Sequence, residues 1–203
     1  MLRYLIDPAN AITTSGLLFS AISLFMAVSD RLEIAMAAAL WAVLADHLDG
    51  IVASRTRNRR PDFAKIGKSL DGFGDIIYGA VLPAVVIIQL SDKSVLSFST
   101  ATALLLAGAI RLSYFANFGR SEDGRFLGVP LSYDVPLLAL AFLVKPLLPP
   151  ELFQTMTNIG FLLLAGAHVA SIRVPPPNGA MYAAISIFAI SASSFLLMRG
   201  LSA

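Results

Sequence analysis

The sequence predicts an all-α polytopic membrane protein. Two features indicate this class: the apolar composition of the chain and the length of its apolar runs. Of its 203 residues, 57% are hydrophobic and only 14% are charged, which is far from an average soluble domain. The apolar runs reach the roughly 20 residues that a membrane-spanning helix needs. We therefore expect one integral membrane domain over residues 1–203. The chain has no cysteine, which excludes disulfides, thiolate metal sites and cysteine nucleophiles.

We expect a short N-terminal interfacial helix and a core of six membrane-spanning helices, with a seventh span as a further candidate. In residues 1–9, Arg3 would face lipid headgroups while neighbouring apolar side chains enter the lipid. The apolar spans are predicted at about residues 10–28, from 34 onward, 66–90, 96–118, from 130 to the turn before 150, 152–170 and 180–198.

Four carboxylates interrupt the second and third predicted spans. These are Asp46, Asp49, Asp71 and Asp75, and each lies in a segment that is otherwise apolar enough for a bilayer. Ionisable residues at membrane depth are costly, so they usually mark a functional site. Four charges of one sign, without matching basic side chains at helical spacing, indicate that the missing partner is a cation.

The spacing of the acids places each pair on one helical face, because residues three or four apart are neighbours on a helix. Small residues continue both stripes, and they are Ala42, Gly50 and Ala53 on the first helix and Gly67 and Gly79 on the second. Small residues allow helices or a ligand to approach closely. Two such faces turned together form an oxygen-rich site that suits Mg²⁺, Mn²⁺ or Ca²⁺. A pair of divalent ions could then assist an in-line phosphoryl displacement.

Two other interpretations of the acids are open. They could be solvated residues at helix ends, or they could line the path of a divalent-cation channel or transporter. A permeation path predicts carboxylates at mid-bilayer or at both faces, whereas all four lie toward one face of the predicted bundle.

Basic residues in the connection between the second and third spans predict the orientation of the bundle. This connection and the start of the next span carry six basic residues, Arg55, Arg57, Arg59, Arg60, Lys65 and Lys68, against the single acid Asp62. Cytoplasmic loops carry such an excess. We therefore expect the acids at the cytoplasmic face of the cell's inner membrane. The basic residues could also attract anionic headgroups, and Arg55 or Arg57 could bind substrate phosphates.

The acidic pattern also resembles a family signature. Asp46-x-x-Asp49-Gly50-x-x-Ala53, followed by Gly67-x-x-x-Asp71-x-x-x-Asp75, is similar to the signature of the CDP-alcohol phosphotransferases. The resemblance implies an integral membrane enzyme that uses two divalent cations, Mg²⁺ or Mn²⁺ and possibly Ca²⁺, and that forms a homodimer. It implies that all four acids hold metal, that Asp75 is also the general base, and that CDP is bound by Asp49, Gly50, Ala53, Gly67 and Asp71.

One position departs from that signature. The family usually has arginine directly after the alanine, where this chain has Ser54, followed by Arg55. One residue along a helix rotates a side chain by about 100°, so Arg55 need not point where the usual arginine does. Arg57, four residues beyond Ala53, could take over its role.

Later segments bear on the acceptor alcohol. Arg111 lies about two turns inside the fourth span, where an interior position facing a polar cavity suits it better than snorkelling. The stretches 111–118, 126–130 and 170–175 resemble those of bacterial and archaeal phosphatidylserine synthases in the family, although Tyr114 stands at the position of a second arginine. His168 is expected to be a helix-packing or interfacial polar residue rather than a ligand.

The resemblance therefore implies transfer of the phosphatidyl group of CDP-diacylglycerol to a small alcohol, with release of CMP. Serine is the preferred acceptor, and inositol phosphate, glycerol 3-phosphate and choline are alternatives. Arg111 could bind a carboxylate or a phosphate of the acceptor equally well. A family member without activity is a further possibility, to which Ser54 gives slight support. The expected partners are membrane lipids and these substrates, with no nucleic acid.

Overall fold

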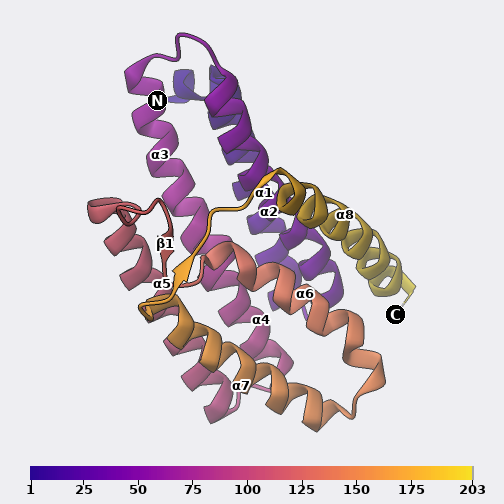
Figure 1. Ribbon diagram of the computed structural model, residues 1–203. Helices are drawn as coiled ribbons and strands as arrows, with labels where there is room; N and C mark the ends of the chain where they lie inside the picture. Colours follow the sequence, from indigo (N-terminus) through magenta and orange to yellow (C-terminus); the bar gives the residue numbers. More distant parts are fainter. Residues whose placement is uncertain (203) are drawn as a thin grey trace.

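The computed structural model describes residues 1–202, most of which form α-helices (Figure 1). The helices are α1 (Pro8–Val28), α2 (Leu32–Arg55), α3 (Pro61–Ile76), α4 (Leu82–Leu90), α5 (Val95–Phe118), α6 (Asp134–Val144), α7 (Pro150–Val169) and α8 (Gly179–Ser202). Strands β1 (Phe126–Leu127) and β2 (Arg173–Val174) form a small antiparallel ladder in which Phe126 pairs with Val174. The predicted all-α bundle is confirmed.

Local signals set the helix ends near the site. Asp7 caps α1 by accepting a hydrogen bond from the backbone N–H of Asn10 at 3.0 Å, and Pro8 takes the first helical position. Aspartate is a favoured N-cap and proline is tolerated in the first turn. Pro61 likewise begins α3, five residues before the predicted start at residue 66. The earlier start shortens the α2–α3 connection to the residues between Arg55 and Pro61.

The helix from Pro61 to Leu90 is continuous but changes its winding in the middle. A π-helical turn covers Ile77–Val81 between α3 and α4. Pro83 lies just beyond it, and a proline inside a helix removes a backbone donor and crowds the preceding turn. Wide turns of this kind accommodate an extra residue and occur frequently at functional sites. Here the wide turn begins two residues after Asp75.

Within residues 1–202, six helical segments are long and apolar enough to cross a membrane. They are Pro8–Val28, Leu32–Arg55, Pro61–Leu90, Val95–Phe118, Pro150–Val169 and Gly179–Ser202. The predicted span beginning at residue 130 differs, because α6 has only 11 residues between two 3₁₀ turns. At about 1.5 Å per residue the 11 residues of α6 cover roughly half of a bilayer's hydrocarbon core, and the two 3₁₀ turns, at about 2 Å per residue, continue the helical run at both ends. Pro130, Pro146 and Pro149 flank this short helix.

Helix α2 lies at the centre of the bundle, between α1 and α8. Its inward positions are mostly alanine, and Ala35, Ala39 and Ala42 are almost wholly buried. A Cβ on Gly16 of α1 would lie 3.1 Å from the Cβ of Ala45. Small side chains thus bring α1 and α2 close together, and the carboxylates of α2 are held beside the start of α1.

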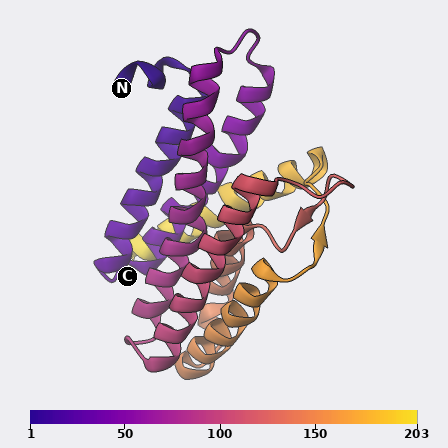
Figure 2. The same ribbon diagram turned by 90° about the vertical axis from the view of Figure 1, so that its left-hand side faces the viewer.

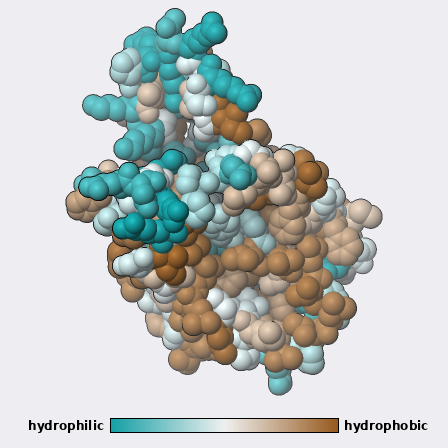
Figure 3. Space-filling view, in the orientation of Figure 1, coloured by the Kyte–Doolittle hydropathy of each residue, from teal (hydrophilic) through white to brown (hydrophobic). Residues whose placement is uncertain are grey.

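The surface divides into an apolar and a polar part. In Figure 3, hydrophobic residues cover most of the lower molecule, and hydrophilic residues gather above, over the N-terminus and the α2–α3 connection. The 3₁₀ turn Leu2–Ile6 lies at that same end, at a steep angle to α1 (Figure 2). Leu2 and Ile6 are about four-fifths exposed, as an interfacial segment requires. The protein is a multi-pass membrane protein.

Candidate active site

The two acids of α2 lie near its polar end. Asp49 is buried and accepts a hydrogen bond from the hydroxyl of Thr13 on α1. Asp46 lies almost one turn earlier and is half-buried. Because α1 and α2 pack along much of their length, the contact with Thr13 fixes the direction in which Asp49 points.

The acids of α3 lie just before the π-helical turn. The hydroxyl of Tyr78 donates a hydrogen bond of 2.8 Å to Oδ1 of Asp75. Tyr78 is almost completely buried and belongs to the wide turn itself. The changed winding thus places a hydroxyl beside one carboxylate oxygen of Asp75 and leaves the other oxygen without that contact.

Two adjoining cavities are lined by the four predicted metal ligands, the residues predicted to bind CDP and Arg111. We call the first the nucleotide-side cavity; it has a volume of about 210 Å³, and its lining includes Asp49, Gly50, Ala53, Gly67 and Asp71. These are all five residues predicted to bind CDP. We call the second the acceptor-side cavity; it measures about 450 Å³, and its lining includes Asp46, Gly50, Asp71, Asp75 and Arg111. Gly50 and Asp71 belong to both linings.

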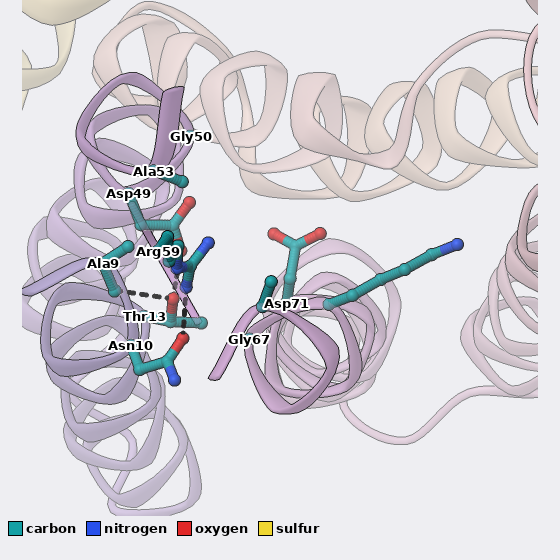
Figure 4. A pocket seen from close by; sticks show the side chains of 11 residues that line it. Ala9, Asn10, Thr13, Asp49, Gly50, Ala53, Arg59, Gly67 and Asp71 are labelled. Atoms are coloured by element: carbon teal, nitrogen blue, oxygen red, sulfur yellow. Dashed lines mark hydrogen bonds between the residues drawn. The ribbon is translucent and has the colours of Figure 1, made fainter. Parts of the chain in front are cut away.

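Figure 4 shows the nucleotide-side cavity between three helices. Asp49 reaches into it from α2 and Asp71 from α3, while Asn10 and Thr13 approach from α1. A Cβ added to Gly50 would meet no atom within 4 Å. The backbone at Gly50 is therefore open to both cavities. A ligand in either cavity can approach this backbone closely, which a side chain at position 50 would prevent.

An arginine that sequence reasoning did not assign to the site lines the nucleotide-side cavity. Arg59 donates to Asp7 from Nε at 3.0 Å and from Nη2 at 2.8 Å, and Nη2 lies 2.7 Å from the amide oxygen of Asn10. We call Asp7, Asn10 and Arg59 the arginine clasp. Burial alone would raise the pKa of Asp7, but hydrogen bonds from Arg59 and from the backbone N–H of Asn10 hold it below its ordinary value.

Arg55 and Arg57 lie outside both cavities, and their binding of substrate phosphates stays a prediction. Both side chains are exposed. The basic residues that do line the nucleotide-side cavity are Arg59 and Lys68. The α2–α3 connection folds back on α1 because Arg59 donates hydrogen bonds to the carboxylate of Asp7, the N-cap of that helix. The acid at position 7, at the same end of the bundle as the basic connection, is the signal that could have indicated this contact.

Gly67 has a neighbour that explains the absence of a side chain. A Cβ there would lie 2.7 Å from Nη2 of Arg59 and would also overlap the amide oxygen of Asn10. The glycine thus lets α3 approach the arginine clasp closely. Gly72, on the same helix, is under no such constraint, because a Cβ there would have no neighbour within 4 Å.

Arg111 lies on the wall of the acceptor-side cavity, as expected for an arginine inside a span. The residue is only 8% exposed, and its guanidinium lies 5.6 Å from the ring centroid of Phe115. Nη2 makes a long hydrogen bond of 3.5 Å to the carbonyl of Gly128. Within the described part of the chain, Nε is buried and has no hydrogen-bond partner.

The donor set suits divalent ions that keep part of their hydration. Asp46, Asp71 and Asp75 line one cavity, and Asp49 lines the adjoining one. Within residues 1–202, no three acidic or imidazole side chains converge closely enough to enclose an ion by themselves. Mg²⁺ is usually bound by one or two carboxylates with several waters and substrate phosphates, rather than by an all-protein cage. The carboxylates therefore fit such an ion.

Comparison with known proteins identifies the family. A model described as CDP-alcohol phosphatidyltransferase matches residues 7–196, which is most of the chain. The chain belongs to this family. The match covers both cavities, the arginine clasp and helices α1 to α7 in full.

Two curated relatives are similar at low identity. An archaetidylserine synthase of Methanothermobacter thermautotrophicus is 27% identical over 161 residues, which are 78% of this chain and 65% of the relative. A CDP-diacylglycerol–serine O-phosphatidyltransferase of Helicobacter pylori is 25% identical over 173 residues, which are 82% of this chain and 70% of the relative. The match to the archaeal protein thus spans slightly less than two thirds of that protein's length.

Proposed function

We propose that the protein transfers the phosphatidyl group of CDP-diacylglycerol to serine and releases CMP. The observation that carries the proposal is the arrangement of the family signature around two adjoining cavities. All five residues predicted to bind CDP line one cavity, and Asp46, Asp71, Asp75 and Arg111 line the other. A nucleotide in the first cavity would thus have its diphosphate beside the acids, next to an acceptor in the second.

On the nucleotide side, the residues of this chain would bind and orient the CDP group. The open backbone at Gly50 and the absent side chain at Gly67 leave room for it. Arg59 and Lys68 supply positive charge at the cavity wall. The guanidinium is already fixed by Asp7 and Asn10, so little side-chain entropy is lost when a ligand meets it.

Asp46, Asp49, Asp71 and Asp75 would hold two divalent cations, Mg²⁺ or Mn²⁺. When bound, such ions neutralise the charge of the diphosphate and of the departing CMP. The four aspartates offer only oxygen ligands and are at least partly buried, which supports the choice of a hard divalent cation. The buried hydrogen bond from Thr13 would keep the Asp49 carboxylate pointing toward the nucleotide-side cavity.

Asp75 would act as the general base. The serine hydroxyl oxygen attacks the phosphorus that carries the diacylglycerol, the bond from that phosphorus to the CMP oxygen breaks, and the hydroxyl proton passes to Asp75. Tyr78 occupies Oδ1 of Asp75 at 2.8 Å, which orients the carboxylate so that its other oxygen can accept the proton. A positioned base must lie within hydrogen-bonding reach of the proton that it removes.

Arg111 would bind the carboxylate of serine in the acceptor-side cavity. Its Nε is buried without a partner among the described residues, and an arginine fork matches a carboxylate well. Arg120 lines the same cavity and adds positive charge. The names of the two relatives, an archaetidylserine synthase and a CDP-diacylglycerol–serine O-phosphatidyltransferase, also support serine.

The reaction would take place at the cytoplasmic face of the inner membrane. The basic α2–α3 connection supports this orientation through the positive-inside rule. On α2 and on the helix from Pro61 to Leu90, the lining residues of both cavities lie in the half nearer this connection. The homodimer that the family resemblance implies stays a prediction, which mass measurement of the purified protein in detergent would test.

The central experiment offers the purified protein CDP-diacylglycerol with one alcohol at a time. We expect CMP release with serine, and not with inositol phosphate, glycerol 3-phosphate or choline. Chelation by EDTA should abolish the release, and excess Mg²⁺ or Mn²⁺ should restore it, because the carboxylates alone leave the diphosphate charge uncompensated. Release with another alcohol would reassign the acceptor. No release with any alcohol, together with divalent-cation flux into vesicles, would favour a channel instead.

Replacing Arg59 by glutamine should weaken donor binding. The change removes the charge and the double contact with Asp7, and a charge-assisted hydrogen bond contributes about 1.5–3 kcal/mol. We expect an increase of about tenfold or more in the Km for CDP-diacylglycerol. Arg57→Gln is the matched control, because Arg57 is exposed two residues away. Equal effects of the two substitutions would remove Arg59 from the proposed site.

A further inference from the structure

A short segment forms one wall of the acceptor-side cavity. This segment, residues 128–133, is called the strap here, and its residues Pro130, Leu131, Ser132 and Tyr133 line the cavity. Leu131 fits against two glycines: a Cβ on Gly79 would lie 2.7 Å from the Leu131 Cβ, and a Cβ on Gly108 would lie 3.6 Å from its Cδ1. The strap is therefore seated directly on the helices that carry Asp75 and Arg111.

The backbone of the strap is also bound to the end of α7. Gly128 donates to the carbonyl of Ile172 at 2.8 Å, and Val129 donates to the carbonyl of Ala167 at 3.1 Å. Gly128 has a φ of +74°, which favours glycine, and a Cβ there would overlap the carbonyl oxygen of His168. The first two residues of the strap thus have little freedom relative to α7.

A buried polar pair fastens both ends of the strap. Nδ1 of His168 lies 2.8 Å from the carbonyl oxygen of Val129. Its Nε2 forms a hydrogen bond of 3.1 Å with Oδ2 of Asp134, and both side chains are completely buried. A carbonyl oxygen only accepts hydrogen bonds, so Nδ1 carries a hydrogen. One imidazole therefore connects the start of the strap to the first residue of α6, which directly follows it.

The strap in turn contacts the arginine of the site. The carbonyl of Gly128 accepts the 3.5 Å hydrogen bond from Nη2 of Arg111. A shift of Gly128 would move or release the guanidinium at the cavity wall. Burying a polar pair such as His168 and Asp134 in an apolar bundle is costly unless its hydrogen bonds are made, so this contact resists displacement.

We infer that His168 and Asp134 are positioning residues for the acceptor: together they fix the strap and, through Gly128, hold Arg111 at the wall of the acceptor-side cavity. The inference rests on the proposed function and concerns the acceptor alone. Neither residue belongs to the lining of the nucleotide-side cavity. A purely structural pair would change stability, whereas a positioning pair changes the Km for the acceptor separately from that for the donor.

Three substitutions at His168 separate its two contacts. His168→Asn keeps an amide donor near the Nδ1 position, His168→Gln keeps one near the Nε2 position, and His168→Leu keeps neither. We expect His168→Leu to raise the Km for serine about tenfold, the fold-change that corresponds to one or two hydrogen bonds. The Km for CDP-diacylglycerol and kcat should change less than about threefold, and the Asn and Gln variants should lie between wild type and Leu.

The partner residue provides a conservative rescue. Asp134→Asn can still hydrogen-bond Nε2 and should stay near wild type, whereas Asp134→Leu should match His168→Leu. Asn158→Leu is the control. Asn158 is a buried residue of α7, the helix that carries His168, and it donates a hydrogen bond of 2.8 Å to Ser91. It is absent from the acceptor-side lining. This variant should lower the unfolding temperature and leave the Km for serine unchanged.

The kinetics distinguish the possible failures. If His168→Leu lowers only the unfolding temperature, or raises the Km values of donor and acceptor equally, the positioning role is wrong. If the Leu variants do not fold, the Asn and Gln variants decide the question, since an unchanged Km for serine in both would contradict the inference. Failure of the proposed function itself would appear earlier, as no serine-dependent CMP release by the wild-type protein.

Discussion

Replacing Asp75 by asparagine should abolish CMP release while donor binding persists. Asparagine keeps the size of the side chain and one oxygen that can accept from Tyr78, which now donates to Oδ1 at 2.8 Å. It cannot accept the proton of the acceptor hydroxyl. Loss of a general base costs about 10²- to 10⁴-fold in rate, so the expected kcat falls by at least that lower factor. Serine-dependent CMP release and binding of CDP-diacylglycerol are the two measurements.

Asp62 offers the control for this substitution. It lies in the first turn of the same helix and pairs with Arg60 at 2.9 Å, outside both cavities. Asp62→Asn removes the same charge from α3 and should leave activity unchanged, because an exposed ion pair contributes little. Substantial activity in Asp75→Asn would remove Asp75 as the base and leave it, at most, as a metal ligand.

The second large effect is expected when Gly67 becomes alanine. The new methyl group would lie 2.7 Å from Nη2 of Arg59 and would overlap the amide oxygen of Asn10. Both atoms belong to the arginine clasp, so relief of the overlap breaks hydrogen bonds of 2.7 and 2.8 Å. The methyl group also enters the nucleotide-side cavity. We expect donor affinity to fall by more than the roughly tenfold expected for Arg59→Gln, measured by titration with CDP.

Gly72→Ala is the matched control on the same helix. Nothing lies within 4 Å of the position that its Cβ would take. Alanine is favoured over glycine inside a helix by about 1 kcal/mol, so this variant should be as stable as wild type or more so, with unchanged affinity for CDP. If Gly67→Ala binds CDP as well as Gly72→Ala does, the clasp does not shape the nucleotide-side cavity.

Much of the fold and the acidic part of the site could be predicted because they depend on short spacings. Asp46 and Asp49 share a helix, as do Asp71 and Asp75, and helical periodicity alone places each pair on one face. The positions of Gly50 and Gly67 follow from the same periodicity. Apolar length likewise predicted the long helices, since a bilayer sets their minimum. It did not predict that α6 would be only 11 residues long, with a 3₁₀ turn at each end.

The arginine clasp and the polar pair could not be predicted in this way, because each joins residues far apart in the chain. Arg59 meets Asp7 across 52 positions, and His168 meets Asp134 across 34. No periodicity relates such residues, and the early start of α3 at Pro61 decides where Arg59 lies. His168 was expected to be a helix-packing or interfacial polar residue, but an acid such as Asp134 within an apolar stretch is itself a signal that a buried partner exists.

The shared wall of the two cavities has a thermodynamic consequence. Gly50 and Asp71 belong to both linings, so a ligand that shifts either residue changes the surroundings offered to a second ligand. Such coupling is reciprocal at equilibrium. Under the proposed function, the factor by which saturating serine changes the affinity for CDP-diacylglycerol must equal the factor by which saturating CDP-diacylglycerol changes the affinity for serine.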